Sequence, residues 1–431
     1  MMAGQPVLPG AEEDLAAGKR NASRSMIPRP DEVRALTVEY DLLSDPAIQG
    51  YLEVALDRLL YTTRLLSALS LQTPKVLEIG ARPYLMTVLL KKCLGYELTA
   101  LTEPWAGRPE AGTEQIRNLV TGELLEIPFV TANIETDQLP LGTESFDLVI
   151  FCEVIEHLTH DPTWALVEIH RVLKRGGLLL VSTPNALRWE YLRRMLKGTN
   201  YYPPYSGYGT TARHNREFST SELRELLEGC GFSLKSIETV RDAAYDHPRL
   251  WDRAATVFTK FGLWRDRLDV IHALAQRGDT SRLCYPEHLY YDIHGYRRIT
   301  DPFVRMGVND QLQIDHSGFY PLEDWPPKIR WTKRKANVFL RGSGQSSLTI
   351  RFFSGERAGN VRGSIAAAGD LIAEFDAPAG VWFEQEFAMQ RAVQGEIEVS
   401  VSVSDPWVPH RLSGNGDTRE LGVALERLEL C

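Results

Sequence analysis

Residues 145–185, SFDLVIFCEVIEHLTHDPTWALVEIHRVLKRGGLLLVSTPN, decide the fold class of this chain. Two apolar runs, DLVIFC and GGLLLVST, lie on either side of a segment with helical spacing of its apolar residues, THDPTWALVEIHRVLK. Apolar strands that alternate with helices are typical of a parallel sheet covered by helices on both faces. The stretch therefore predicts a strand, a helix and a second strand of an α/β domain.

The same alternation continues on both sides of this stretch. An amphipathic helix is expected over residues 55–69, where ALDRLLYTTRLLSAL repeats apolar residues at helical spacing. Residues 221–232, SELRELLEGCGF, predict a further helix that ends at a glycine. We expect a Rossmann-like, doubly wound domain with a seven-stranded sheet over residues 29–285. Its other strands are indicated by KVLEIG (75–80), YELTALTE (96–103), FVTANI (129–134) and LDVIHALAQ (268–276).

The pattern of the sequence changes after about residue 300. In EIEVSVSVS (396–404), apolar and polar side chains alternate, as they do in strands that are buried on one face only. Turn residues separate several such runs, which predicts an all-β sandwich or jelly roll over residues 321–431. Residues 286–320 are expected to form a linker or insert. Residues 1–28 are polar and rich in small side chains, so we expect them to be disordered.

Composition argues against several classes of protein. The 431 residues include 48 Lys and Arg against 57 Asp and Glu, and the net charge of −9 disfavours a large nucleic-acid surface. The five cysteines lie far apart, so neither a disulfide framework nor a thiolate zinc site is expected. No run approaches the ~20 apolar residues that span a bilayer. Because the N-terminus also lacks the apolar core of a secretion signal, we expect a cytoplasmic protein without a transmembrane segment.

Polar residues follow the predicted strands at their carboxyl ends, where open parallel sheets bind ligands. Glu78 and Gly80 end the first strand, Glu103 ends the second, and Cys152 and Glu153 end the fourth. Carboxylates accept hydrogen bonds both from ammonium groups and from ribose hydroxyls. The acids after the first two strands therefore suit a ligand that carries both groups.

Residues 145–185 resemble, almost without interruption, the central motifs of class I S-adenosylmethionine-dependent methyltransferases of the type 11 group. The resemblance implies S-adenosylmethionine as cofactor. It places Glu103 at the ribose hydroxyls, although the acid of the family usually falls where this chain has Thr102. Arg82 and Tyr84 replace further glycines of the family, so the contacts to the methionine end are expected to differ. The implied cofactor-binding residues are Glu78, Gly80 and Ala81 at the methionine end, Glu103 at the ribose, Asn133 and Ile134 at the adenine, and the Cys152 backbone near the sulfonium.

Glu153, Glu156 and His157 are spaced i, i+3 and i+4, which places them on one face of a helix opening after the fourth strand. Two carboxylates and an imidazole suit a divalent cation such as Mg²⁺ and leave positions open for substrate. The E-x-x-E-H arrangement resembles ubiquinone-pathway O-methyltransferases and small-RNA 3′-terminal 2′-O-methyltransferases, and the RNA enzymes imply His214 as a further ligand. We expect metal ligands at Glu153, Glu156, His157 and His214, and catalytic roles for His157, Glu153 and His214. Alternatively, the glutamates are charges at a helix N-terminus, and His157 is either a metal-free general base or a histidine satisfied by local hydrogen bonds.

The expected acceptor is a sugar hydroxyl of a glycan or of an activated sugar, because a vicinal diol can chelate a cation through both oxygens. Aromatic side chains offer flat surfaces for sugars or bases. The candidates are Tyr201, Tyr202, Tyr205 and Tyr208 after the fifth strand, and Trp325, Trp331, Trp382 and Trp407 in the C-terminal part, which resembles sandwich modules of polysaccharide-processing enzymes. Two alternatives stay open: an RNA 2′-O-methyltransferase, and a non-catalytic partner in polysaccharide assembly. Nucleic acid is the less favoured partner because of the acidic net charge, and the sequence leaves the oligomeric state open.

Overall fold

The computed structural model describes residues 27–42, 51–105, 107–159, 161–202, 213–242, 266–286, 289–290, 299, 301–413 and 416–431. The chain divides into two compact units. The first consists of Met1–Ala165, Val172–Arg224 and Leu234–Arg277, and the second of Leu166–Arg171, Glu225–Ser233 and Gly278–Cys431. Residues 1–28, which we expect to be disordered, lie outside the described residues except for the last two.

An eight-stranded mixed sheet organises the first unit, in the order β3-β4-β2-β1-β5-β6-β8-β7. The central strands β4, β2, β1, β5 and β6 are parallel, whereas β3 is antiparallel to β4 and β8 is antiparallel to β6. The doubly wound α/β fold is therefore confirmed, with one strand more than the seven expected. The strands are β1 Lys75–Ile79, β2 Glu97–Thr102, β3 Ala111–Arg117, β4 Leu124–Thr131, β5 Phe146–Cys152, β6 Leu173–Pro184, β7 Phe232–Val240 and β8 Val270–Arg277.

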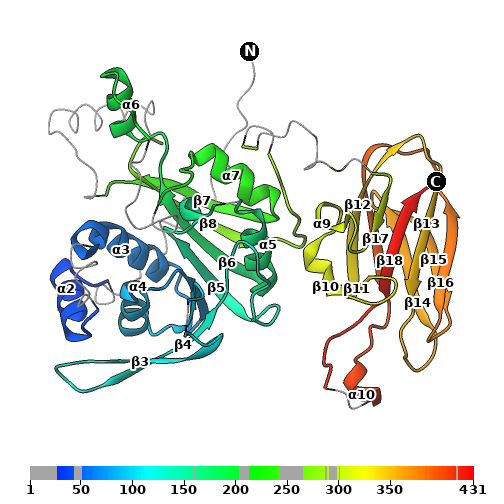
Figure 1. Ribbon diagram of the computed structural model, residues 1–431, viewed down its shortest axis with the longest axis horizontal. Helices are drawn as coiled ribbons and strands as arrows, with labels where there is room; N and C mark the ends of the chain where they lie inside the picture. The colour runs from blue at the N-terminus through cyan, green and yellow to red at the C-terminus, as the bar shows by residue number, and fades with distance from the viewer. Residues whose placement is uncertain are drawn as a thin grey trace. The chain divides into compact units, whose positions relative to one another are not determined.

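Helices α2, α3 and α4 lie beside the sheet and share its core (Figure 1). The expected amphipathic helix α3 buries Leu52, Leu56 and Leu59 at helical spacing, and these leucines belong to one apolar cluster with Val76 of β1. Among the described residues, no helix is both long enough and apolar enough to cross a membrane. The helices are α2 Pro30–Glu39, α3 Tyr51–Ala68, α4 Leu85–Leu89, α5 Thr163–Val172, α6 Trp189–Leu196 and α7 Thr220–Gly229, with a π-helical turn η2 at Leu90–Leu94 and a 3₁₀ turn η3 at Ile155–His157.

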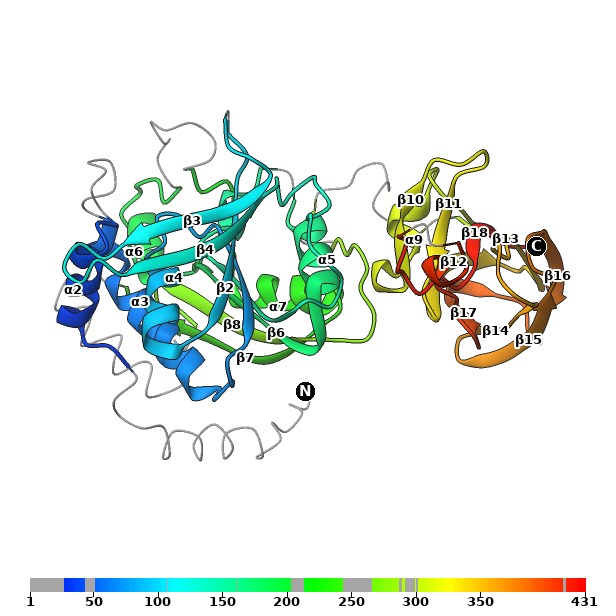
Figure 2. The ribbon, with the colours of Figure 1, turned by 90° about the horizontal axis from the view of Figure 1, so that it is seen from below.

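The parallel strands bring their carboxyl ends to one edge of the sheet. Ile79 of β1 pairs with Leu101 of β2, which in turn pairs with Val130 of β4. The pairing continues past the strand ends, because the Gly80 amide donates to the Leu101 carbonyl at 3.0 Å. The segments after β1, β2 and β4 are therefore neighbours, as a ligand site at this edge requires. The outer hairpin of β3 and β4 extends along the edge of the sheet (Figure 2).

Two antiparallel sheets form a β-sandwich in the second unit, as expected. One has the order β10-β11-β18-β13-β16 with β9 paired to β18, and the other has the order β12-β17-β14-β15. In β17 the alternation is confirmed, because Val399, Val401 and Val403 are buried in the core between the sheets. The strands are β9 Phe303–Arg305, β10 Phe319–Glu323, β11 Ile329–Thr332, β12 Lys335–Ser343, β13 Ser347–Phe353, β14 Val361–Ala367, β15 Asp370–Ala377, β16 Trp382–Ala388, β17 Gln394–Val403 and β18 Ala424–Leu430, with short helices α9 Asp310–Gln313 and α10 Pro409–Ser413.

The sandwich begins earlier than the expected boundary at residue 321. Val304 of β9 pairs with Leu428 of β18, and Phe319 of β10 pairs with Thr332 of β11. Much of the stretch 286–320, expected to be a linker or insert, therefore supplies strands of the sandwich. The sequence signal is weak here because β9 has only three residues and takes its partner from the last strand of the chain.

The four tryptophans expected to form a sugar-binding platform differ in exposure, although Trp325 packs against Trp331 with ring centroids 6.2 Å apart. Trp331 is buried and packs edge-on against Trp407, with ring centroids 5.9 Å apart. Trp325 and Trp382 are 39% and 37% exposed, and both contact the Phe353 ring. Trp331 therefore belongs to the core of the sandwich, Trp407 is half-buried, and Trp325 and Trp382 are the most exposed of the four.

Candidate functional site

Two adjoining pockets open at the carboxyl ends of β1, β2, β4 and β5. With the open solvent at their mouths included, the larger contains about 1700 Å³ of space and the smaller about 540 Å³. Ile79, Gly80, Arg82 and Glu153 line both pockets. A ligand longer than either pocket can therefore pass from one to the other beside Gly80 and Glu153.

The larger pocket gathers the residues expected to bind the ribose and the adenine. Glu103 lies beyond the end of β2, and Asn133 and Ile134 lie in the loop after β4; all three line the pocket. Trp105 lies on the same wall and adds an exposed aromatic face. Thr102 lines the pocket as well, but its side chain is buried and its hydroxyl oxygen has no hydrogen-bond partner. Glu103 is thus the exposed acid at this point.

The smaller pocket gathers the residues expected at the methionine end. Glu78, Gly80, Ala81 and Cys152 all line it. Gly80 adopts a left-handed backbone conformation with φ of +73°, and a Cβ atom there would lie 2.6 Å from the Val154 side chain. A larger residue would therefore be strained and would collide with the loop after β5.

Glu78 is a buried acid at the floor of the smaller pocket. The Thr87 hydroxyl donates to its Oε2 at 2.5 Å, but burial outweighs this contact and raises the pKa of Glu78 to about 8. Burial also raises the pKa of the Cys152 thiol, to about 12. At neutral pH both groups are therefore protonated in the free protein, and Cys152 is a poor nucleophile.

Replacing Glu78 by Gln should change how stability depends on pH. The pKa of Glu78 is raised to about 8 from an ordinary 4.5, so the folded protein binds more protons than the unfolded chain between these values. The free energy of unfolding of the wild type should then fall as pH rises from about 5 to 8, by at most about 1.4 kcal/mol per pH unit from this group. Denaturant unfolding across this range should show a gap between Glu78→Gln and wild type that widens with pH. Glu126→Gln, an exposed change on β4, should run parallel to wild type, and a parallel curve for Glu78→Gln would contradict the prediction.

Arg82 and Tyr84 do not both enter the pockets. Tyr84 is buried, and its hydroxyl donates to Glu114 of β3 at 2.6 Å. Arg82 lines both pockets, and its guanidinium lies 5.1 Å from the centre of the Trp105 ring. Of the two side chains that replace glycines of the family, only Arg82 is therefore placed to contact a ligand here.

Glu153 lies apart from the other expected metal ligands. It follows β5 in a left-handed conformation with φ of +54°, and the chain then forms the short 3₁₀ turn η3 instead of an α-helix. The expectation that Glu153, Glu156 and His157 share one helical face is therefore wrong. The Glu153 carboxylate accepts from the Ser182 hydroxyl at 2.8 Å and lies 3.6 Å from the Arg58 guanidinium.

Glu156, His157 and His214 form a cluster that fits a metal ion. One ligand atom from each lies within 4.8 Å of the others. The Thr183 hydroxyl donates to Oε2 of Glu156 at 3.0 Å, whereas Oε1 is buried without a hydrogen-bond partner and lies 3.8 Å from Nε2 of His157. Burial, followed by the negative charge of Glu153, raises the pKa of Glu156 well above its usual value. A carboxylate oxygen in this state gains strongly from a cation beside it.

Each histidine of the cluster is oriented through its Nδ1 atom. The Arg213 carbonyl lies 3.0 Å from Nδ1 of His157, and the Glu217 carboxylate lies 2.8 Å from Nδ1 of His214. Both partners can only accept, so both histidines carry a proton on Nδ1, which leaves Nε2 for the cluster. Burial lowers the pKa of His157, which favours its neutral form with a lone pair on Nε2. Histidines that ligate metals are usually held in this way through the second ring nitrogen.

Sequence reasoning missed Arg58, Thr183 and Glu217. Arg58 lines the smaller pocket from α3, and it pairs with Asp242 at 3.1 Å as well as with Glu153. No motif marks it, because it lies in a helix well before β1. Glu217 follows His214 by three residues, and this spacing is the one sequence signal that links it to the cluster.

Residues 77–181 match the family model of a methyltransferase domain. The chain thus contains a methyltransferase domain. Over 98 residues it is 37% identical to a probable S-adenosylmethionine-dependent methyltransferase of Mycolicibacterium smegmatis, a match that covers 23% of this chain and 33% of that protein. Over 163 residues it is 26% identical to a ubiquinone biosynthesis O-methyltransferase of Pseudomonas syringae pv. tomato. This match covers 38% of this chain and 66% of that protein.

A solved S-adenosylmethionine-dependent methyltransferase from Archaeoglobus fulgidus shares 16% identity at a TM-score of 0.36, and covers 54% of this chain and 100% of that chain. The residues of this chain that match the mycobacterial relatives cover about a third of the length of those proteins. The matched methyltransferase domain includes Glu78, Glu103 and Glu156. Arg58 and His214 lie outside it, before and after the matched residues.

Proposed function

We propose that this protein is an S-adenosylmethionine-dependent O-methyltransferase that acts on a sugar hydroxyl of a glycan or activated sugar. The observation that carries the proposal is the pair of adjoining pockets at the strand ends of the methyltransferase domain, with the Glu156, His157 and His214 cluster nearby. His157 links these features, because it belongs to the cluster and also lines the larger pocket.

The two pockets suit the two halves of the methyl donor. Glu103 offers a carboxylate to the ribose hydroxyls, and Asn133 and Ile134 offer a polar and an apolar contact to the base. Arg58, in the smaller pocket, offers a positive charge to the carboxylate of the methionine end. Glu78 is neutral in the free protein and would ionise beside the ammonium group, because an adjacent positive charge favours the carboxylate form. Glu153 lines both pockets, so it would lie near the place where the two halves join.

The cluster suits a divalent cation, which would lower the pKa of a coordinated hydroxyl. The unpartnered Oε1 of Glu156 and the Nε2 atoms of His157 and His214 are the ligands it offers. Two imidazoles and one carboxylate favour a transition-metal ion such as Mn²⁺ or Zn²⁺ over the Mg²⁺ expected initially. In the transfer itself, the acceptor oxygen bonds to the methyl carbon as the carbon–sulfur bond breaks, and the hydroxyl proton is lost to a base. Glu153, which is outside the cluster, is the carboxylate that we assign to accept it.

A sugar acceptor is supported by the aromatic residues after α6. Tyr201 and Tyr202 are exposed, and Tyr201 packs against Tyr191 with ring centroids 5.6 Å apart. Exposed tyrosine rings favour the faces of sugars. The other two tyrosines of this stretch, Tyr205 and Tyr208, lie outside the described residues.

Calorimetry with S-adenosylmethionine tests the donor, and mass spectrometry tests the acceptor. We expect saturable donor binding, followed by a mass gain of one methylene in glycan or sugar-nucleotide pools treated with the protein. Absence of donor binding would favour the non-catalytic alternative. A mass gain confined to RNA, with affinity that falls steeply with salt, would favour RNA 2′-O-methylation, which the same Glu156, His157 and His214 cluster also suits.

A further inference from the structure

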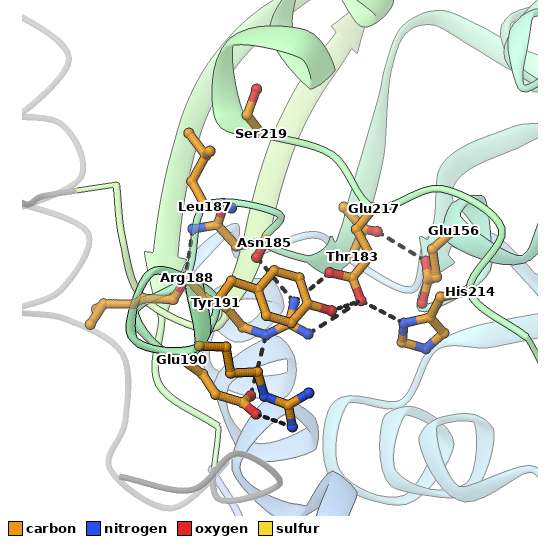
Figure 3. Close-up of polar contacts among 12 residues, drawn as sticks. Glu156, Thr183, Asn185, Leu187, Arg188, Glu190, Tyr191, His214, Glu217 and Ser219 are labelled. Atoms are coloured by element: carbon orange, nitrogen blue, oxygen red, sulfur yellow. Dashed lines mark hydrogen bonds and ion pairs between the residues drawn. The ribbon is translucent and has the colours of Figure 1, made fainter. Parts of the chain in front are cut away.

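Glu217 is a buried carboxylate on which several donors from two segments of the chain converge (Figure 3). Its side chain is only 5% exposed. His214 and Tyr191 donate to its Oε1, at 2.8 Å and 3.0 Å, and Nη2 of Arg188 lies 3.3 Å from the same oxygen. Nη1 of Arg188 donates to Oε2. Both oxygens of the carboxylate are therefore held by donors, and the Arg188 guanidinium contacts both of them.

The donors that hold Glu217 are themselves fixed. Arg188 is the N-cap residue of α6 and is as buried as Glu217. Its Nη1 also donates to the Asn185 carbonyl at 3.1 Å, and its guanidinium lies 3.5 Å from the centre of the Tyr191 ring. Asn185 is fully buried and donates to the carbonyls of Asp266 and Leu268. The carboxylate therefore has one position, set by the end of β6 and the start of α6.

This fixed carboxylate determines which ring atom His214 presents. Because Nδ1–H is directed at Glu217, Nε2 is the ring atom of His214 that is left for the cluster. The ligand atoms of Glu156, His157 and His214 lie within 4.8 Å of one another. The two histidines differ in one respect: a backbone carbonyl holds His157, whereas a carboxyl group paired with Arg188 holds His214. A carboxylate makes the imidazole a stronger donor to a cation than a carbonyl does.

We propose that Glu217 is a positioning residue that holds His214 in its Nδ1–H tautomer and thereby sets the affinity of the Glu156, His157 and His214 cluster for a divalent cation. The inference rests on the metal-assisted function proposed above. It assigns Arg188 and Tyr191 to the support of this carboxylate, so that the start of α6 is coupled to the cluster. If the Arg188–Glu217 ion pair were purely structural, weakening it would destabilise the fold. It would not change the tautomer of His214 or the affinity of the cluster for a cation.

The test uses the full chain, with Mn²⁺ as the probe in calorimetry and ¹⁵N-labelled histidine in NMR. Glu217→Gln keeps the size of the side chain and removes its charge. We expect it to weaken Mn²⁺ binding about 10- to 100-fold, the range typical of such partners, and to remove the fixed Nδ1–H signature of His214 while that of His157 persists. Glu168→Gln is the matched control, because Glu168 is a similarly buried carboxylate that pairs with Arg171 at 2.7 Å and belongs neither to the cluster nor to the pockets. It should bind Mn²⁺ as the wild type does.

Each outcome decides for or against the role of Glu217. If Glu217→Gln does not fold, Tyr191→Phe removes one of the same hydrogen bonds and should weaken Mn²⁺ binding by a smaller factor. Mn²⁺ affinity within about threefold of wild type in the folded variant, with an unchanged His214 signature, would overturn the proposal. If the wild type binds no Mn²⁺, the metal-assisted function fails and the claim about cation affinity fails with it. The NMR result then decides whether Glu217 holds the His214 tautomer: loss of the His214 signature in Glu217→Gln supports this role, and its persistence overturns it.

Discussion

Replacing Glu156 by Gln should reduce the rate of methyl transfer by at least about 100-fold. Losses of this size are found when one group that stabilises a developing charge is removed. The affinity for S-adenosylmethionine should stay within a few-fold of the wild type. Oε1 of Glu156 is buried and has no hydrogen-bond partner, so an amide nitrogen in its place would remove the one carboxylate ligand of the cluster. The contact with Thr183 can be kept through the remaining oxygen. Glu156 does not line either pocket, so donor binding should change little.

The same substitution should not destabilise the protein in the absence of metal. A buried carboxylate oxygen without a partner is costly, and a neutral amide of equal size lowers that cost. Thermal unfolding of Glu156→Gln without added cation should therefore occur at or above the wild-type temperature. Loss of transfer together with retained stability separates a ligand role from a structural one.

Transfer is measured with methyl-labelled donor and an extract of acceptors, with and without exhaustive chelation. Wild-type activity should be lost on chelation and restored by Mn²⁺, whereas Glu156→Gln should respond to neither treatment. Glu144→Gln, which changes a partly exposed acid that pairs with Arg277 and belongs neither to the cluster nor to the pockets, serves as the control and should behave as wild type. Full activity of Glu156→Gln in a chelated sample would disprove the metal role of the cluster.

The central strands were predictable because they are apolar on both faces. β1 and β5 are nearly continuous buried runs, and their parallel pairing then places the residues that follow them at one edge of the sheet. For this reason the expected cofactor residues line the two pockets although they are far apart in the sequence. The topology, more than any single motif, made these positions predictable.

The edge strands were not predictable in the same way. β3 is exposed along its whole length except for two half-buried residues, so it has no apolar run to mark it. β7 carries FSLKSIETV, in which only the first residue is buried. Edge strands of this kind are defined by their hydrogen-bonded neighbour, which the local sequence does not specify.

Glu153 shows why spacing alone did not define the metal cluster. The i, i+3, i+4 pattern predicts one face only if the backbone is α-helical, and here the chain leaves β5 through a left-handed residue into a 3₁₀ turn. Glu156 and His157 stay together because they are adjacent in that turn. His214 joins them because the Asn215 and Arg216 amides donate to the Glu156 carbonyl, a long-range contact that no local pattern encodes.

Replacing Glu103 by Ala should weaken S-adenosylmethionine binding by about 10- to 100-fold, the value of one hydrogen-bonded charged group at roughly 1.5–3 kcal/mol. Glu103 is an exposed acid at the carboxyl end of β2 that lines the larger pocket, where its carboxylate can accept from two vicinal hydroxyls. Thr102→Val is the informative comparison, because the acid of the family usually falls at that position. Its hydroxyl is buried without a partner, so this change should alter affinity by less than about threefold if Glu103 is the ribose acid.

Calorimetry with two ligands separates recognition of the ribose from a general effect of charge. The loss caused by Glu103→Ala should be the same for S-adenosylmethionine and S-adenosylhomocysteine, because both carry the ribose diol, and it should vanish for an analogue that lacks those hydroxyls. Glu97→Ala, which removes an exposed acid from the opposite end of the same strand, should leave all three affinities unchanged. If Thr102→Val weakened binding while Glu103→Ala did not, the ribose would be recognised one residue earlier. In that case the ribose would have to lie deeper in the pocket than the exposed carboxylate of Glu103. The reason is that Thr102, the last residue of β2, is buried.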